Sequence, residues 1–250
     1  MHPGAQEQGL ASVLQLPIRL CRGISGGGRS MARLPAGEGS ASWRGDRSIM
    51  IPKKALGIIG SPRKEKSVST RLLSAMLAVF AEAGWETQTF DATQPGLLDC
   101  NGCNACEATG RCVLKDALQE AYDSALAAGA ILVASPVYFR APGAAVKRFV
   151  DRCQGFWLRR FRLKDPEFLA RPTRPCMLIA TAGGPPVPRL FDAGEIVLRS
   201  FCTTLGLDFW PGLYVTDTET LSPQRLRNLE GEAGERVREM LRSYTDGRGE

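Results

Sequence analysis

The chain has 250 residues, of which 44% are hydrophobic and 23% charged, and its formal net charge is +6. This length and apolar content suffice for one large hydrophobic core or two small ones. The single histidine, His2, argues against Ser-His-Asp and Cys-His nucleophile systems and against histidine metal triads. The chemistry must therefore come from a cofactor, from thiolates, or from Lys, Tyr and carboxylate side chains.

Residues 1–49 are rich in Gly, Ser, Arg and Pro and show no hydrophobic period, which predicts a disordered N-terminal extension before a domain at 50–250. The extension holds six arginines and three acidic residues, so half of the net charge lies there and the rest of the chain is only mildly basic. We see no arginine stripe with interleaved aromatic residues and expect no nucleic-acid partner. Met50, directly before the first predicted strand, is a candidate translation start.

We expect neither a membrane span nor a signal peptide in this sequence. There is no uncharged apolar stretch of about 18 residues, so we expect no membrane span. The faintly apolar segment 10–20 lacks the basic start of a signal peptide. Clustered cysteines without an export signal indicate a reducing compartment, so we expect a cytoplasmic protein whose cysteines have a metal or redox role.

From Lys54 onward, short apolar runs typical of strands alternate with amphipathic helical patterns. In chain order we predict strand 55–59, helix 72–80, strand 86–91, helix 115–128, strand 130–135, helix 143–153, strand 177–181, helix 195–205, strand 209–215 and helix 226–240. This alternation predicts an α/β fold with a parallel sheet covered on both faces. Ligands of such a sheet bind at the carboxyl ends of its strands, which directs attention to the loops there.

The loop after the first predicted strand runs Gly-Ser-Pro-Arg-Lys-Glu-Lys-Ser-Val-Ser-Thr. It has neither the spacing of a Walker loop nor the G-x-G-x-x-G pattern of a dinucleotide site. Its hydroxyls and cations precede a helix and suit a phosphate monoester, although a solvated basic loop around a helix cap is the alternative. The candidate phosphate ligands are Ser61, Arg63, Ser67, Ser69 and Thr70.

The loops after the third and fourth predicted strands complete a constellation that is typical of flavin mononucleotide (FMN). An aromatic residue beside a strand end can stack on a planar ring, and glycines let backbone amides approach a ligand edge. Taken singly, each loop also reads as ordinary packing or a turn. The candidate ring contacts are Pro136, Val137, Tyr138, Phe139, Thr181 and Gly183. No catalytic side chain is expected, because the flavin would carry the chemistry.

Four of the eight cysteines lie within thirteen residues, with the spacing C-x2-C-x2-C-x5-C. Thiolates at three-residue steps converge on a small volume, as an iron–sulfur cluster requires. Structural zinc usually takes two separate two-cysteine pairs, so zinc and a regulatory disulfide are the weaker alternatives. The candidate ligands are Cys100, Cys103, Cys106 and Cys112. We interpret Cys153, Cys176 and Cys202 as small buried hydrophobes, and Cys21 has no assigned role.

Three motifs in this order resemble the NAD(P)H-dependent FMN reductase family, and among its members the iron–sulfur flavoproteins. They are the loop 60–64, the cysteine run 100–112, and Ser-Pro-Val-Tyr-Phe at 135–139 followed by Val-Lys-Arg-Phe-Val-Asp-Arg at 146–152. The resemblance covers roughly 54–205. Asp116 stands alone where many relatives carry two adjacent acids.

The resemblance implies a flavodoxin-like, doubly wound five-stranded parallel sheet of order 2-1-3-4-5, with the cysteine-rich loop after the second strand. It also implies FMN at the strand ends, a 4Fe-4S cluster on the four cysteines, and a homodimer or homotetramer in which clusters and flavins of neighbouring subunits face each other. Flavin beside cluster converts two-electron into one-electron transfer, so we expect an oxidoreductase with NAD(P)H or reduced ferredoxin as donor. The alternatives are a cluster-free NAD(P)H-dependent FMN or quinone reductase and an iron–sulfur redox-sensing module.

Overall fold

The computed structural model describes residues 51–246. The predicted disordered extension 1–49, His2, Cys21 and the candidate start at Met50 lie outside these described residues. Within residues 51–246, no helix is both long and apolar enough to cross a membrane.

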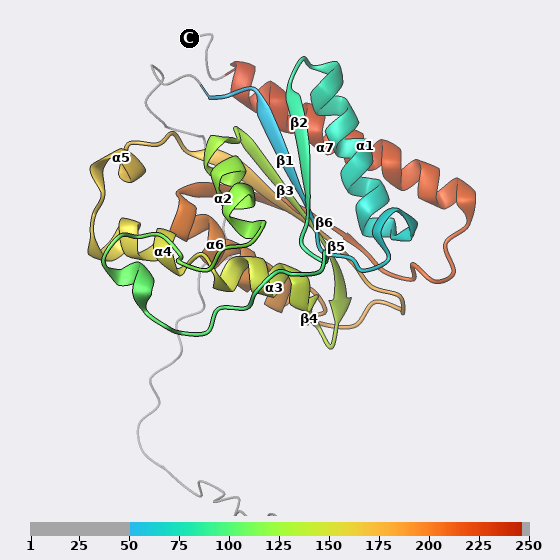
Figure 1. Cartoon of the computed structure of the whole chain (residues 1–250). Coiled ribbons are helices and arrows are strands. Elements are labelled where there is room, and N and C mark those ends of the chain that lie inside the picture. Colours follow the sequence, from blue (N-terminus) through green and yellow to red (C-terminus); the bar gives the residue numbers. More distant parts are fainter. Residues whose placement is uncertain (1–50, 247–250) are drawn as a thin grey trace, which may run out of the picture. The chain divides into compact units, whose positions relative to one another are not determined.

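The centre of the fold is a parallel sheet of order β2-β1-β3-β5-β6 (Figure 1). Its strands are β1 (Lys54–Ile59), β2 (Glu86–Asp91), β3 (Ala130–Tyr138), β5 (Arg174–Thr181) and β6 (Leu207–Val215). The predicted flavodoxin-like order 2-1-3-4-5 is confirmed, since β5 and β6 are the fourth and fifth parallel strands. One strand lies outside the prediction: the two-residue β4 (Ala141–Pro142) turns back antiparallel along the end of β3.

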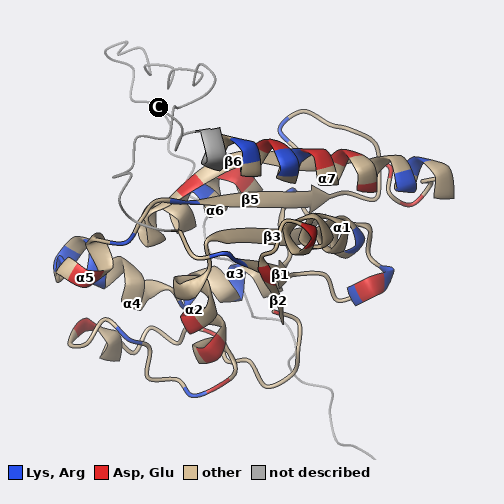
Figure 2. Ribbon diagram, turned by 90° about the horizontal axis from the view of Figure 1, so that it is seen from above, with Lys and Arg blue, Asp and Glu red and all other residues tan. Residues whose placement is uncertain are grey.

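Helices cover both faces of this sheet, as the alternating pattern predicts (Figure 1). One face carries α1 (Val68–Glu82) and α7 (Pro223–Asp246), and the other carries α2 (Leu118–Ala127), α3 (Ala144–Asp151) and α6 (Asp192–Leu205). Figure 2 shows basic and acidic residues interspersed along α7, the polar side of an amphipathic helix whose apolar stripe is buried.

The two middle strands explain why the sequence shows continuous apolar runs there. Ile131 and Val133 of β3 point into the core under α2, α3 and α6, whereas Leu132 and Ala134 point into the core under α1 and α7. All eight residues of β5 are buried in the same alternating way. A strand that is buried on both faces needs apolar side chains on both faces. Its sequence therefore lacks the alternation of apolar and polar residues that a half-buried strand shows.

Residues 154–173 form a run of short helical pieces. The sequence predicts no element there, because it shows no sustained hydrophobic period. They comprise α4 (Gln154–Trp157), the π-helix η3 (Leu158–Arg162) and α5 (Pro166–Leu169). The single-turn 3-10 helices η1 (Lys64–Lys66) and η2 (Ala105–Glu107) lie in the loops after β1 and β2. These pieces matter because α4 and η3 lie beside the cysteine-rich loop (Figure 1).

The buried guanidinium of Arg174, at the start of β5, holds the C-terminal end of α2. Its Nη1 donates to three carbonyl oxygens: those of Ala125 (3.2 Å), Leu126 (2.8 Å) and Ala128 (2.6 Å). A cation at this end of a helix also opposes the negative end of the helix dipole. Arg174 therefore joins α2 to the sheet by polar contacts inside the core.

We predict that Arg174→Met lowers the free energy of unfolding by about 3 kcal/mol or more, because three carbonyl oxygens lose their donor at about 1–3 kcal/mol each and methionine has no donor to replace it. Arg225→Met on the solvent side of α7 is the control: its ion pair with Glu232 (2.6 Å) is exposed and should contribute below about 1 kcal/mol. Urea unfolding of both variants checks this, and equal losses would contradict it.

Candidate functional site

The loop between β1 and α1 buries its hydroxyl groups at the start of a helix. Ser61, Ser67, Ser69 and Thr70 are all buried, whereas Arg63 is exposed. Ser67 Oγ lies 2.8 Å from Ser69 Oγ and makes no capping bond to the first turn of α1, which contains no acidic residue. Within the described residues, the buried Thr70 Oγ1 has no hydrogen-bond partner. Such a helix start offers an anion both donors and a favourable dipole.

This loop lies directly against the end of β3, and at Gly60 the contact leaves no room for a side chain. The amide of Gly60 donates to the carbonyl of Ala134 (2.8 Å), and a Cβ on Gly60 would lie 2.3 Å from Val146 Cγ2. A Cβ on Gly143 would meet the carbonyl oxygen of Gly60 at 3.4 Å and Pro136 Cγ at 3.5 Å. The phosphate-loop candidates and the Pro136 loop are therefore neighbours.

The end of β3 forms a tight hairpin with β4 whose tip is aromatic. Phe139 and Arg140 both have positive φ values, 49° and 63°. A two-residue hairpin turn favours that geometry, but residues other than glycine pay strain for it. Pro136 is buried and Val137 half-buried, whereas Tyr138 is exposed and Phe139 fully so. Strain and an exposed aromatic ring at the carboxyl end of a central strand mark the hairpin as a candidate binding element.

The loop after β5 is joined to the loop after β6 by backbone hydrogen bonds. The amide of Thr218 donates to the carbonyl of Ala182 (3.1 Å), and that of Asp217 to the carbonyl of Gly184 (2.8 Å). A Cβ on Gly183 would lie 2.7 Å from the carboxylate of Glu219, so no larger residue fits without displacing that side chain. Thr181 is buried and pairs in register with Pro136, which places this loop beside the β3 hairpin.

The structure thus brings the candidate flavin contacts together at one end of the sheet, on three loops that adjoin in the order β1, β3, β5 (Figure 1). The orphaned hydroxyl of Thr70 and the helix start fit a phosphate monoester. The aromatic hairpin fits a planar ring.

The four clustered cysteines line a single cavity of about 370 Å³ in the loop between β2 and α2. Trp157 and Leu158 at the junction of α4 and η3, together with Arg152 and Arg162, line its other side. Burial raises the pKa of the Cys106 thiol, and the neighbouring thiolates of Cys112, Cys103 and Cys100 raise it further. All four cysteines therefore border the same volume.

The donor set of four cysteine thiolates is the kind that a 4Fe-4S cluster takes. Among residues 51–246, no three His, Cys, Asp or Glu side chains converge closely enough to hold one metal ion. Zinc needs its four ligands at about 2.0–2.3 Å from one point. In a 4Fe-4S cluster each cysteine binds a different iron, so the sulfurs surround a volume instead of a point. The four cysteines of the cavity supply that donor set in chemistry and in number, although within residues 51–246 they do not converge as a metal-binding group.

A buried ion pair between Arg152 and Asp116 joins the two ends of the cysteine loop. Arg152 Nη1 donates to Asp116 Oδ2 and to the carbonyl of Leu98 (3.3 Å), and Nη2 donates to the carbonyl of Leu114 (3.0 Å). Asp116 in turn accepts hydrogen bonds from the amides of Leu98 (2.8 Å) and Leu118 (3.1 Å). The side chain of Arg152 is fully buried and that of Asp116 is 4% exposed.

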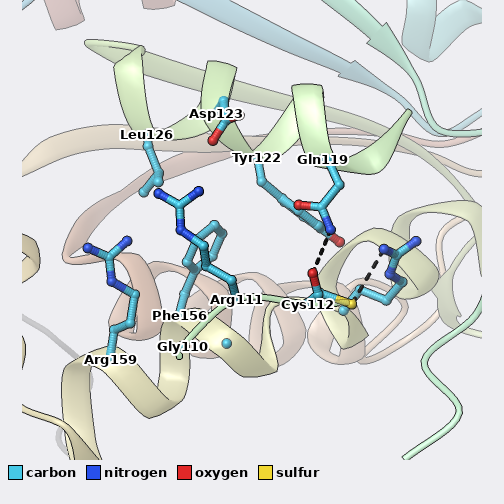
Figure 3. Close-up of a pocket in the computed structure, with 11 residues that line it drawn as sticks. Gly110, Arg111, Cys112, Gln119, Tyr122, Asp123, Leu126, Phe156 and Arg159 are labelled. Carbon is cyan, nitrogen blue, oxygen red and sulfur yellow. Dashed lines mark hydrogen bonds between the residues drawn. The ribbon is translucent and has the colours of Figure 1, made fainter. Parts of the chain in front are cut away.

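Cys112 is held from two sides beside a small pocket (Figure 3). Gln119 of α2 donates to the carbonyl of Cys112 (2.8 Å), and Arg152, the residue directly after α3, donates to its sulfur at 3.5 Å. Burial alone lowers the pKa of Arg152, but the hydrogen bonds to Cys112 and Asp116 raise it above its ordinary value. The guanidinium therefore stays charged beside the thiol.

Two further arginines form ion pairs between the cysteine loop and the neighbouring helices. Arg148, one turn before Arg152 on α3, pairs with Asp99 (2.7 Å), and Arg162 of η3 pairs with Glu107 (3.3 Å). The loop also touches α4 directly, since a Cβ on Gly155 would lie 2.5 Å from the carbonyl oxygen of Gly110. Sequence reasoning assigned no role to Arg152 or Gln119. The spacing of Arg148 and Arg152, one helical turn apart after β3, is the sequence feature that could have indicated contacts with the cysteine loop.

The NADPH-dependent FMN reductase family matches residues 53–185, slightly more than half of this chain. Two similar archaeal proteins are each named iron–sulfur flavoprotein. The protein from Methanosarcina thermophila is 36% identical over 112 residues, which cover 45% of this chain and 58% of that protein. The protein from Methanocaldococcus jannaschii is 37% identical over 110 residues, which cover 42% and 56%. The chain therefore spans about half the length of these relatives.

Solved structures share the fold at low identity. An FMN-dependent NADH-azoreductase from Bacillus anthracis, solved in complex with FMN, has a TM-score of 0.55 at 14% identity, covering 75% of this chain and 98% of its own. An NAD(P)H:quinone oxidoreductase from Methanothermobacter marburgensis has a TM-score of 0.54 at 14% identity, covering 76% and 99%. Both likenesses support the flavodoxin-like architecture.

We predict that Asp116→Asn destabilises the cysteine loop by about 3–5 kcal/mol, because it leaves the buried charge of Arg152 unpaired. Asp99→Asn is the matched control in the same loop: its partner Arg148 is partly exposed, so the loss should stay below about 1 kcal/mol. Amide hydrogen exchange over residues 98–118 measures the local effect. Equal protection in the two variants would show that the buried pair does not hold the loop.

Proposed function

The chain belongs to the NADPH-dependent FMN reductase family, and on this basis we propose that it is an oxidoreductase that binds FMN at the carboxyl ends of β1, β3 and β5. We propose further that the four clustered cysteines bind a 4Fe-4S cluster that exchanges electrons with the flavin. When bound, FMN supplies two-electron chemistry and the cluster one-electron transfer. The protein supplies binding, orientation and electrostatics.

The observation that carries the FMN proposal is the orphaned hydroxyl of Thr70 at the start of α1. A buried hydroxyl without a partner costs free energy, so its retention beside three other buried serine hydroxyls favours a ligand that pairs with it. We assign the phosphate to Ser61, Ser67, Ser69 and Thr70, with exposed Arg63 at the mouth of the loop.

We assign the ring to the hairpin side of the site. Pro136 and Val137 form the floor next to the phosphate loop, and Tyr138 and Phe139 supply exposed aromatic surface. Thr181 and Gly183 supply the neighbouring edge, where the hydrogen bonds to the β6 loop keep the backbone in place. A pre-formed backbone edge lowers the ordering cost of binding.

The cluster proposal rests on the shared cavity of Cys100, Cys103, Cys106 and Cys112. Arg152 and Arg162 in its lining oppose the negative charge that four thiolates would gather there. The names of the archaeal relatives support the same assignment.

A cluster-free NAD(P)H-dependent FMN or quinone reductase is the second candidate. It is favoured by the absence, among residues 51–246, of side chains that converge on a single metal ion. NAD(P)H or reduced ferredoxin as the donor, a homodimer or homotetramer, and a cytoplasmic location stay predictions. The fully exposed Phe139 and the half-exposed pair Trp157 and Phe161 are apolar surface that suits subunit contacts.

We predict that Thr70→Val raises the stability of the flavin-free protein by about 1 kcal/mol and weakens FMN binding by about tenfold or more. The substitution removes an unpaired buried hydroxyl, and the same hydroxyl would bond the charged phosphate when FMN binds. Ser74→Ala is the control, because Ser74 is exposed one turn later and donates to the carbonyl of Thr70 (3.0 Å). Urea unfolding and fluorescence titration measure the two effects. Unchanged FMN affinity in Thr70→Val would remove Thr70 from the site.

We predict that replacing any one of Cys100, Cys103, Cys106 or Cys112 by Ala lowers iron content, while FMN binding persists, because the sheet and its three loops lie outside the cysteine cavity. Cys202→Ala is the control, since Cys202 is buried in α6 and should leave iron unchanged. Iron, acid-labile sulfide and flavin are quantified after purification and reconstitution without oxygen. Wild-type protein that holds about one FMN and no iron supports the cluster-free reductase instead.

A further inference from the structure

Arg152 is one of two arginines that are fully buried within residues 51–246, and it lies against the cysteine cavity. Its Nη2 donates to Cys112 Sγ at 3.5 Å. We propose that Arg152 is a positioning residue that raises the reduction potential of the cluster by donating an N–H···S hydrogen bond to Cys112. This inference rests on the proposed function, because it requires a cluster on the four cysteines.

The orientation of this donor is fixed by contacts that need no cluster. Asp116 and the carbonyl of Leu98 hold Nη1, and the carbonyl of Leu114 holds Nη2 at 3.0 Å. The planar guanidinium has donors in a rigid fork, so these acceptors also fix where the second N–H of Nη2 points. The side chain of Arg152 is fully buried, and Cys112 beside it is half-buried.

Such a bond favours the reduced cluster for an electrostatic reason. An added electron increases the negative charge on the cluster and on its cysteine sulfurs, and a charge-assisted hydrogen bond strengthens as its acceptor becomes more negative. Hydrogen bonds to the sulfurs are among the factors that set cluster potentials. A tenfold preference for the reduced state raises a one-electron potential by about 59 mV.

The test must remove the hydrogen bond of Arg152 without changing the net charge near the cluster. This is possible because Asp116 carries the opposite charge in the same ion pair. Arg152→Met combined with Asp116→Asn removes the donor and leaves the net charge of the pair unchanged. Arg148→Met combined with Asp99→Asn is the matched control. It lies on the same helix and holds the same loop, but its pair is more exposed and no hydrogen bond joins Arg148 to a cysteine.

The test is an EPR-monitored redox titration of the anaerobically reconstituted holoprotein. The Arg152/Asp116 double variant should have a potential lower by about 59 mV, equal to a tenfold loss of preference for the reduced cluster. The Arg148/Asp99 double variant should match the wild type. If the Arg152/Asp116 variant keeps its iron and also matches the wild type, the inference is wrong. Wild-type protein without a cluster would instead refute the proposed function.

A second measurement does not depend on whether the variant folds. Wild-type protein is labelled with 15N in the arginine guanidinium groups, and the reduced cluster is examined by pulsed EPR. A guanidinium nitrogen bonded to Cys112 should give a resolved 15N coupling, which the Arg148/Asp99 double variant should retain. A wild-type cluster with no such coupling would overturn the assignment.

Discussion

The cysteine loop is attached to the fold by a buried ion pair, Arg152–Asp116, in place of apolar packing. From Leu98 to Lys115 only Gly110 is buried, so the loop has almost no hydrophobic core of its own. A segment of this kind would open at little cost unless polar contacts fixed its ends. Arg152 and Asp116 fix both ends at once, because each contacts residues before and after the cysteines. The shared cavity of the four cysteines depends on that closure.

The flavin end of the sheet has a different physical character. It is built on the ends of largely buried strands, and it contains an unpaired buried hydroxyl and strained backbone angles that lower the stability of the flavin-free protein. Thr70 keeps a buried hydroxyl without a partner, and Phe139 and Arg140 keep strained backbone angles at a hairpin tip. Thr70 lies in the first turn of α1 and the hairpin tip follows β3, and the segments before them meet through Gly60, Gly143 and Pro136. Unpaired polar groups and strained backbone at one edge of a sheet are typical of binding sites, where interactions with a ligand offset their unfavourable free energy.

Much of this architecture follows from the sequence because it depends on local pattern. The buried runs of β3 and β5 and the stripe of α7 are readable from their periods, and parallel topology then places the loops after β1, β3 and β5 together. The Arg152–Asp116 pair was not readable, because it joins residues 36 positions apart and depends on how α3 lies against the loop. The helical pieces at 154–173 were missed for a related reason. Their short turns are stabilised by contacts such as Asp165 with Arg159 (2.7 Å), not by a hydrophobic period. The backbone pairing of Gly184 with Asp217 likewise has no local signature.

A chain that holds both FMN and a cluster accepts more electrons than a chain that holds FMN alone. Anaerobic reductive titration of the reconstituted protein, followed by visible absorption and EPR, counts them. FMN takes two electrons and a cluster takes one. With one FMN and one cluster we expect about three electrons per chain, and a reduced-cluster EPR signal that integrates to about one spin. Reduction that is complete at about two electrons per FMN, without a cluster signal, would contradict the coupling of flavin and cluster in this protein.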